Sequence, residues 1–158
     1  PLTFTSMSYY LAQLNLGLFV APLDADEMAE FVAALDPINA LAESTPGFVW
    51  RLKDDQGGSS SFIDVPDMDN PLWAPNMSIW TDLESLRHFM YQSGHASYLR
   101  RRTEWFQVPN QPITVLWWIP EGEIPTLKNA IKRLSYMAEH GPSDAGWPLT
   151  KPFERPSL

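Results

Sequence analysis

Five polar or aromatic residues recur at helical spacing in the middle of the chain. They are Tyr91, His95, Tyr98, Arg102 and Trp105. Steps of three and four residues place side chains on one face of an α-helix, provided that the helix continues through Gly94. Histidine moves protons near neutral pH, tyrosine bonds phenol or quinone oxygens, and arginine holds anionic oxygens. The stripe predicts catalytic roles for His95, Arg102 and Tyr91 and ligand contacts for Tyr98 and Trp105.

These residues also have a structural interpretation. His95 could bond only to backbone groups, and Arg102 could pair with an acid such as Glu104 or Asp36. Consecutive helical residues point about 100° apart, so a single arginine of the run 100–102 can face inward. We select Arg102 because it shares the stripe with His95. The catalytic and the structural interpretation both stay open at this point.

A second polar set lies in two strand-like segments. Gln13 and Asn15 alternate with apolar residues on one face of the first segment. Asn76 and Trp80 share a face of the other, with Ser78 between them. A buried amide must find hydrogen-bond partners or line a cavity. We therefore predict ligand contacts from Gln13, Asn15, Asn76 and Trp80, the alternative being that neighbouring loops satisfy them.

Several kinds of site have no support in the sequence. The chain has no cysteine, so disulfides, thiolate nucleophiles and iron–sulfur clusters are excluded. Its three histidines, at positions 88, 95 and 140, lack the spacing of zinc ligands. The glycine pair 57–58 is followed by neither a lysine nor a helix start, as a phosphate-binding loop would require. No serine occupies a strand-turn-helix elbow. We expect no metal and no bound cofactor.

Charge and hydropathy restrict the partners and the compartment. Nineteen acidic against eleven basic residues give a net charge of −8, which disfavours nucleic-acid binding. The run Arg100–Arg102 is too short to offset that charge. No segment approaches the roughly 20 apolar residues of a membrane span, and the N-terminus lacks a signal-peptide pattern. We expect a cytoplasmic protein without a membrane partner.

The alternation of apolar and breaking residues predicts one α+β domain. Strands are expected at 9–19, 48–53, 76–81 and 111–119, and the last of them is apolar on both faces, as a central strand would be. Helices are expected from Asp24 to about Pro46 with a bend at Pro37, and from 125 to 141. Between them, Thr81 or Asp82 caps either one kinked helix that runs to about Phe106 or two short helices that meet near Gly94. This order matches the ferredoxin-like β-α-β-β-α-β motif with an extra C-terminal helix.

The remaining segments complete the predicted organisation. Residues 1–6 are interpreted as a leader or expression remnant, 7–142 as the domain, and 143–158 as a Pro-rich tail that docks through Trp147 and Phe153. The long segment 54–74 is typical of a binding loop, a lid or a disordered insertion. Two helices would leave one face of the sheet bare, so we expect a homodimer that buries this face, with Trp50 or Trp117 contributing. Seven Trp in a chain that is 13% aromatic also favour an interface or a pocket.

Four strings of residues resemble an uncharacterised bacterial family, a domain of unknown function. They are Gly-Phe-Val-Trp-Arg-Leu (47–52), Asn-Met-Ser-Ile-Trp (76–80), His-Ala-Ser-Tyr-Leu-Arg-Arg-Arg-Thr-Glu-Trp-Phe (95–106) and Leu-Trp-Trp-Ile-Pro (116–120). That family is assigned to the dimeric α+β barrel superfamily, beside the antibiotic-biosynthesis monooxygenases. The resemblance implies the barrel fold and dimerisation, and a function only by analogy.

The relatives so implied carry out several kinds of chemistry between the helices and the sheet. Some are cofactor-independent monooxygenases, some degrade haem, and some are isomerases. We therefore expect a small-molecule-binding protein, with an oxygenase or isomerase acting on an aromatic or apolar metabolite as the leading hypothesis. A haem protein with His95 as axial ligand is one alternative, and a non-catalytic binding module is another.

Overall fold

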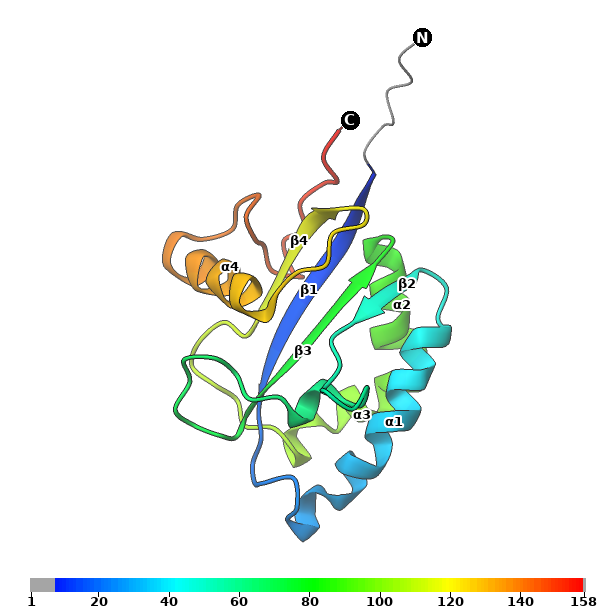
Figure 1. Ribbon diagram of the computed structural model, residues 1–158, viewed down its shortest axis with the longest axis vertical. Helices are drawn as coiled ribbons and strands as arrows, with labels where there is room; N and C mark the ends of the chain where they lie inside the picture. Colours follow the sequence, from blue (N-terminus) through cyan, green and yellow to red (C-terminus); the bar gives the residue numbers. More distant parts are fainter. Residues whose placement is uncertain (1–7, 158) are drawn as a thin grey trace.

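The computed structural model describes residues 8–157 as a four-stranded antiparallel sheet with four α-helices (Figure 1). The predicted leader lies outside these residues. The strands are β1 (Tyr9–Leu18), β2 (Phe48–Arg51), β3 (Trp73–Trp80) and β4 (Thr114–Pro120). The helices are α1 (Ala29–Ser44), α2 (Leu83–Gln92), α3 (His95–Arg100) and α4 (Leu127–His140). Short 3₁₀ turns cover Asp26–Met28, Ser60–Phe62 and Arg102–Glu104. The chain is thus a mixed α+β protein.

The sheet has the order β2-β3-β1-β4, and every neighbouring pair is antiparallel. Each predicted strand is present, although β3 begins three residues early and includes Pro75. β4 was expected to be central and instead ends the sheet order. β4 is apolar on both faces because both faces are covered by other parts of the chain. In addition, Trp147 from the tail pairs with Leu116 along the open side of the strand.

One face of the sheet is covered by α4 and by the segment 63–73. Ala12, Leu14 and Leu16 of β1 pack here with Val115, Trp117 and Ile119 of β4, beneath Ala130, Leu134 and Met137 of α4. Figure 1 shows α4 lying across β4. Trp117 is only 1% exposed, and the Arg133 guanidinium lies 5.1 Å from its ring centroid. The expectation that Trp117 meets a second copy is therefore wrong, because α4 of the same chain buries it.

The opposite face is covered by α1, α2 and the tail. Leu11, Trp80 and Leu116 of the sheet pack here with Ala42 of α1, Leu86 of α2 and Trp147 of the tail. Figure 1 shows α2 behind β2 and β3. The tail contributes Trp147 to this cluster, and Phe153 packs against it. This helix-facing side carries the polar strand residues, so it is the side on which a site must be sought.

The start of α1 differs from the sequence prediction, and residues 83–100 form two helices, which was one of the two predicted alternatives. Asp24 does not cap α1, since a 3₁₀ turn at Asp26–Met28 comes first and has no side-chain cap; Pro37 lies within α1. Asp82 caps α2 as expected, accepting from the Ser85 N–H at 2.7 Å. α2 ends at Gln92, where the backbone of Ser93 is extended and its hydroxyl donates to the carbonyl of Phe89. α3 is a separate helix in consequence.

None of the helices formed by residues 8–157 is both long and apolar enough to cross a membrane.

Candidate functional site

The register of the strands arranges the helix-facing side chains in rows across the sheet. One row is apolar and contains Phe48, Trp80, Leu11 and Trp118. The next contains Ser78, Gln13 and Leu116, and the third contains Asn76, Asn15 and Thr114. Because strand side chains alternate between faces, these rows lie on one surface. We call Gln13, Asn15, Asn76, Ser78 and Thr114 the polar strip.

Asn15 and Asn76 lie directly opposite one another in the polar strip. Their side-chain oxygens are occupied: Asn15 Oδ1 accepts from the Thr114 hydroxyl at 2.7 Å, and Asn76 Oδ1 accepts from Gln13 Nε2 at 2.8 Å. Neither Nδ2 group bonds to any residue in the described range, and neither is sealed from solvent. Asn76 is exposed although it lies near the middle of a strand with neighbours on both sides. The strip therefore presents two amide donors on adjacent strands.

Gln13 bonds to two other residues of the polar strip, Asn76 and Ser78. Its Nε2 also donates to the Ser78 hydroxyl at 2.8 Å, and that hydroxyl accepts a further bond from Trp80 Nε1 at 2.9 Å. Gln13 and Ser78 are 7% and 8% exposed, so this network replaces the solvent that both groups lose. The network fixes the amide orientation of Asn76 and ties the strip to the Trp80 ring.

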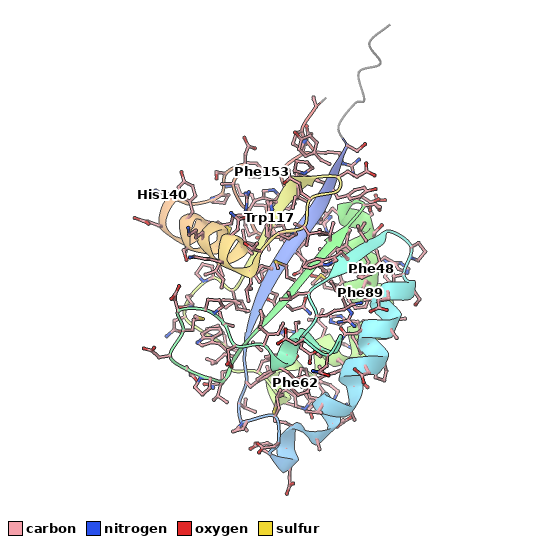
Figure 2. All side chains as sticks on the ribbon, viewed as in Figure 1. Phe48, Phe62, Phe89, Trp117, His140 and Phe153 are labelled. Carbon is pink, nitrogen blue, oxygen red and sulfur yellow. The ribbon has the colours of Figure 1, made fainter. Side chains whose placement is uncertain are left out.

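Aromatic rings close the strip at both ends. Trp80 stacks on Phe89 with ring centroids 5.4 Å apart, and Phe48 meets its edge at 5.5 Å; Figure 2 shows Phe48 and Phe89 close together on the β2 side of the molecule. At the other end Phe106 lies against Gly17, which follows Asn15 on the same face. A side chain at Gly17 would overlap this ring. The polar strip is thus a polar part of the sheet surface that lies between two groups of aromatic rings.

His95 belongs to the same layer between the helices and the sheet. Its ring lies 4.7 Å from that of Phe89, so the contacts that join His95 to the polar strip run through Phe89 and Trp80. His95 Nδ1 lies 3.3 Å from the Met90 carbonyl oxygen. A carbonyl can only accept, so neutral His95 carries its proton on Nδ1 and presents a lone pair at Nε2.

The surroundings of His95 favour that neutral form. Burial lowers the pKa of the imidazole below its ordinary value and outweighs the Met90 hydrogen bond, which raises the pKa. Nε2 bonds to no residue among 8–157, yet it is not sealed from solvent. This nitrogen is available as a proton acceptor or as a ligand.

The other residues of the predicted stripe do not gather around His95. The break between α2 and α3 separates Tyr91, which is 52% exposed, from the rest. Arg102, expected to face inward, is exposed and donates to the Leu99 carbonyl at 2.9 Å. Trp105 is 2% exposed and lies 6.0 Å from the Tyr98 ring, in a cluster with Phe19 at the end of the sheet.

Arg101 makes the ionic contacts that the sequence suggested for Arg102. It binds both carboxylate oxygens of Glu30 at 2.6 and 2.7 Å, it binds Glu104 at 2.6 Å, and its guanidinium lies 4.8 Å from the Trp105 ring centroid. Hydrogen bonds from Arg101 hold the pKa of both glutamates below the ordinary value. Arg101 thereby joins α1 to the turn after α3. Sequence spacing could not choose between neighbouring arginines, because the choice depends on where α1 lies.

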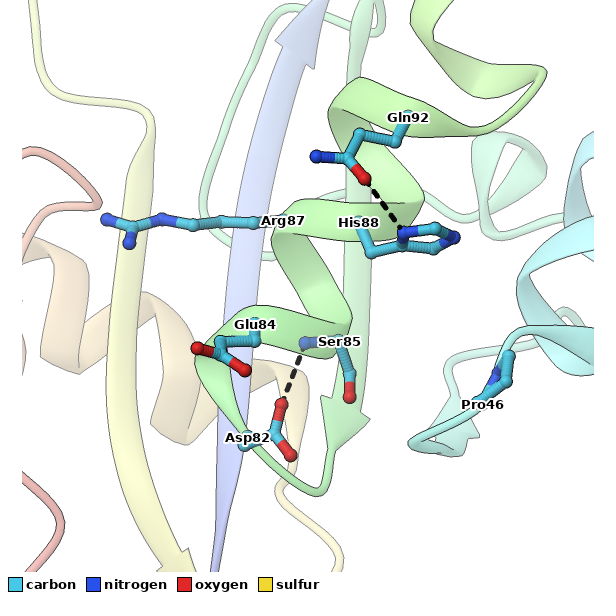
Figure 3. Close-up of a pocket in the computed structure, with 7 residues that line it drawn as sticks. All are labelled: Pro46, Asp82, Glu84, Ser85, Arg87, His88 and Gln92. Atoms are coloured by element: carbon cyan, nitrogen blue, oxygen red, sulfur yellow. Dashed lines mark hydrogen bonds between the residues drawn. The ribbon is translucent and has the colours of Figure 1, made fainter.

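A pocket that the sequence did not indicate lies along α2 (Figure 3). Its volume is about 560 Å³. It is lined by Pro46, Asp82, Glu84, Ser85, Arg87, His88 and Gln92. Most of its polar groups are already used locally, since His88 Nδ1 bonds to Gln92 at 3.2 Å and Asp82 caps the helix. A smaller pocket of about 230 Å³ lies within the segment 64–73.

Neither pocket contains a residue of the polar strip or His95. Within residues 8–157, no group of three or more His, Asp or Glu side chains could hold a metal ion. His95 has one ring nitrogen, Nδ1, held by the Met90 carbonyl, and the other, Nε2, free of protein partners among residues 8–157.

Comparison with known proteins gives the family but no activity. No curated protein matches the chain. The crystal structure of the NE2512 protein of unknown function from Nitrosomonas europaea is similar at 13% sequence identity, with a TM-score of 0.44; the alignment covers 75% of this chain and 96% of that one. A family model described as "Domain of unknown function (DUF3291)" matches residues 10–158. The chain belongs to this family.

Proposed function

We propose that the protein binds a small aromatic molecule through an oxygen atom that accepts hydrogen bonds from Asn15 and Asn76. The observation that carries this proposal is the pair of Nδ2 groups on adjacent strands, each with its oxygen already occupied. Both Nδ2 groups are open to solvent, so they bond to water when no ligand is present. An acceptor oxygen on a ligand can replace that water and bond to both donors at once.

The surroundings of the polar strip indicate the ligand class. Trp80 and Phe106 flank the strip, and aromatic rings are suited to contact a flat apolar body. The two donors are neutral, and no cation bonds to the strip among the described residues. A phenol, quinone or carboxylate oxygen on an aromatic ring would meet these requirements. The ligand would lie between the helices and the sheet.

A catalytic role extends this proposal through His95. An oxygenase or isomerase that works without a bound cofactor needs a proton acceptor, and neutral His95 presents a lone pair at Nε2. Arg102 and Tyr91 lie too far toward the surface to share this role in the arrangement described. We therefore propose His95 as the only base, with the polar strip holding the ligand oxygen.

Haem binding is a second candidate, and one observation favours it. Axial histidines donate from one ring nitrogen to a backbone carbonyl and coordinate through the other, which is the arrangement at His95. When bound, haem would supply redox chemistry at its iron. An absorbance scan after addition of hemin tests this candidate, since a Soret shift that disappears in His95→Ala is expected. An unchanged spectrum removes it.

We also propose a ferredoxin-like topology and a homodimer for the whole chain. The antiparallel order β2-β3-β1-β4 supports the topology, because a split β-α-β unit places its third strand between the first two. A second copy cannot reach Trp117. It would instead contact the outer surface of α4 and the segment 54–72, where Tyr136 and Phe62 are 47% and 56% exposed.

Fragment binding followed by NMR tests the ligand proposal. The panel contains aryl carboxylates, phenols and quinones, with arylamines of the same ring size as controls. We expect ligands with an oxygen acceptor to shift the side-chain amide signals of Asn15 and Asn76, and the arylamines to leave them in place. Asn76→Ala should weaken binding by about tenfold or more, while Asn110→Ala in an exposed loop should not. Binding that is unaffected by Asn76→Ala would overturn the proposal.

A further inference from the structure

The last part of the tail is held to the sheet at few points. Trp147 is fixed firmly, because its N–H and C=O both bond to Leu116, at 2.9 and 2.8 Å. Beyond it, no backbone N–H of residues 148–157 bonds to the rest of the described chain; Lys151 N–H donates to Pro148, within the tail itself. We call residues 148–155 the strap. Its attachment depends on side chains rather than on backbone pairing.

Two hydrogen bonds, a cation–π contact and the packed side chains of Leu149 and Phe153 hold the strap. The Phe153 carbonyl accepts from Trp118 Nε1 at 2.9 Å, and Arg155 donates to the Thr81 carbonyl at 2.7 Å. The Arg155 guanidinium lies 5.0 Å from the Trp118 ring centroid, although Arg155 itself is exposed. Few exposed contacts of this kind allow a segment to open locally while the remaining fold persists.

Phe153 contacts two tryptophans, one through its ring and the other through its carbonyl oxygen. Its ring is stacked with that of Trp147, with centroids 6.3 Å apart and planes at 10°. The Trp118 and Trp147 rings have centroids 6.2 Å apart. The Phe153 ring therefore stacks on the Trp147 indole, and the neighbouring Trp118 indole donates to the Phe153 carbonyl.

The indole N–H of Trp147 has no hydrogen-bond partner among the described residues. Trp147 is 0% exposed, and its Nε1 is the buried side-chain nitrogen for which residues 8–157 provide no hydrogen-bond partner. Buried donors are nearly always paired, because leaving one unpaired forfeits its hydration without replacement. Two neighbouring indoles, one with a paired N–H and one with an unpaired N–H, suggest a place for a group with two acceptor oxygens.

We propose that Trp118 and Trp147 form a binding slot for aryl-alkanoic acids, which Phe153 fills in this structure. In phenylalanine two carbons separate the ring from the carbonyl, and 3-phenylpropionate has the same spacing. Its carboxylate can accept from Trp118 as Phe153 does, and its second oxygen can accept from Trp147. A ligand of this class replaces Phe153 and releases the strap. This slot is separate from the polar strip and does not depend on the ligand proposed there.

NMR of the indole N–H signals tests the slot, with 3-phenylpropionate as the probe and 3-phenylpropylamine as the control. Assignment uses Trp118→Phe and Trp147→Phe. In wild type, the probe should shift both indole signals, with Trp147 moving downfield as it gains an acceptor. In Phe153→Ala, which removes the competing ring, the apparent affinity should rise by about tenfold or more. The amine, which lacks an acceptor, should shift neither signal.

Two outcomes overturn the proposal. One is that neither wild type nor folded Phe153→Ala shows shifts at Trp118 and Trp147 with millimolar probe. The other is that the amine shifts them as strongly as the acid. If Phe153→Ala does not fold, the shifts of the two indole signals in wild type still decide whether the probe binds. Asn76→Ala should leave probe binding unchanged, which separates failure of this slot from failure of the polar-strip proposal.

Discussion

His95 Nδ1 lies 3.3 Å from the carbonyl oxygen of Met90, five residues earlier and across the break between α2 and α3. The break makes this contact possible, because Met90 is close to the end of α2 and its carbonyl is not required by a continuing helix. Ser93 takes part by donating to Phe89 and accepting from the His95 N–H at 3.2 Å. The orientation of the imidazole is thus set by the same turn that ends the helix.

The first prediction concerns the pH dependence of stability. Burial lowers the pKa of folded His95 below 6.5, so on acidification the unfolded chain takes up this proton first. Stability from this group is complete above about 6.5 and is lost as the pH falls toward the lowered value. We expect the melting temperature of wild type to fall more between about pH 7.5 and about pH 5.5 than that of His95→Gln. His88→Gln, at an exposed site on α2, controls for loss of an imidazole. The same fall in melting temperature with pH in wild type and in His95→Gln would contradict this prediction.

The second prediction distinguishes a buried residue of the polar strip, Gln13, from an exposed one, Asn76. Gln13 is buried and holds Asn76 and Ser78, so Gln13→Ala should lower the free energy of unfolding by about 1–3 kcal/mol. Asn76 is exposed, and Asn76→Ala should change the free energy of unfolding by no more than about 0.5 kcal/mol. Urea unfolding measures both. Equal losses would mean that Asn76 is a structural residue and not a ligand contact.

The third prediction compares neighbouring arginines. Arg101 joins Glu30, Glu104 and Trp105, whereas Arg102 bonds only to the end of α3. Arg101→Ala should therefore melt at a lower temperature than Arg102→Ala. High salt should narrow this difference, because exposed ion pairs are screened. Melts of both variants at low and high salt provide the measurement, and a greater loss in Arg102→Ala would contradict the described contacts.

Much of the fold was predictable from alternation and breaking residues, but the site was not. The run 111–119 predicts a strand from its β-branched and aromatic residues, yet its place in the sheet depends on pairing with distant segments, which periodicity does not encode. Similarly, Gln13, Asn15, Asn76 and Ser78 could be assigned to strand faces. Their meeting in one strip required the register of β1 and β3. The predicted helix stripe is interrupted at Ser93, whose extended backbone separates α2 from α3.

The fourth prediction tests the close packing at the end of the strip. A methyl group at Gly17 would overlap the Phe106 ring, so Gly17→Ala should lower the free energy of unfolding by about 1–3 kcal/mol. The same substitution in a Phe106→Ala background should cost less, since the ring that it meets is absent. A double-mutant cycle by urea unfolding measures this coupling. Additive losses would show that the two residues are not in contact in solution.

The fifth prediction concerns the proposed homodimer. Light scattering at micromolar concentration should give about twice the chain mass of 18.0 kDa. Tyr136→Lys on α4 should weaken the dimer, because a charge at an apolar contact must be desolvated. Tyr91→Lys, on the opposite covering layer, is the matched control. A stable monomer of wild type would remove the homodimer proposal and leave the fold as described.

The pairing of Trp147 with Leu116 also protects the open side of β4. Unpaired strand edges offer free N–H and C=O groups to other chains, and a strand as rich in β-branched and aromatic residues as β4 would be a template for aggregation. Trp147 occupies both backbone groups of Leu116, and its side chain covers the strand from one face. The tail therefore acts against misassembly, and proteins shortened before Trp147 should be recovered mainly as insoluble material.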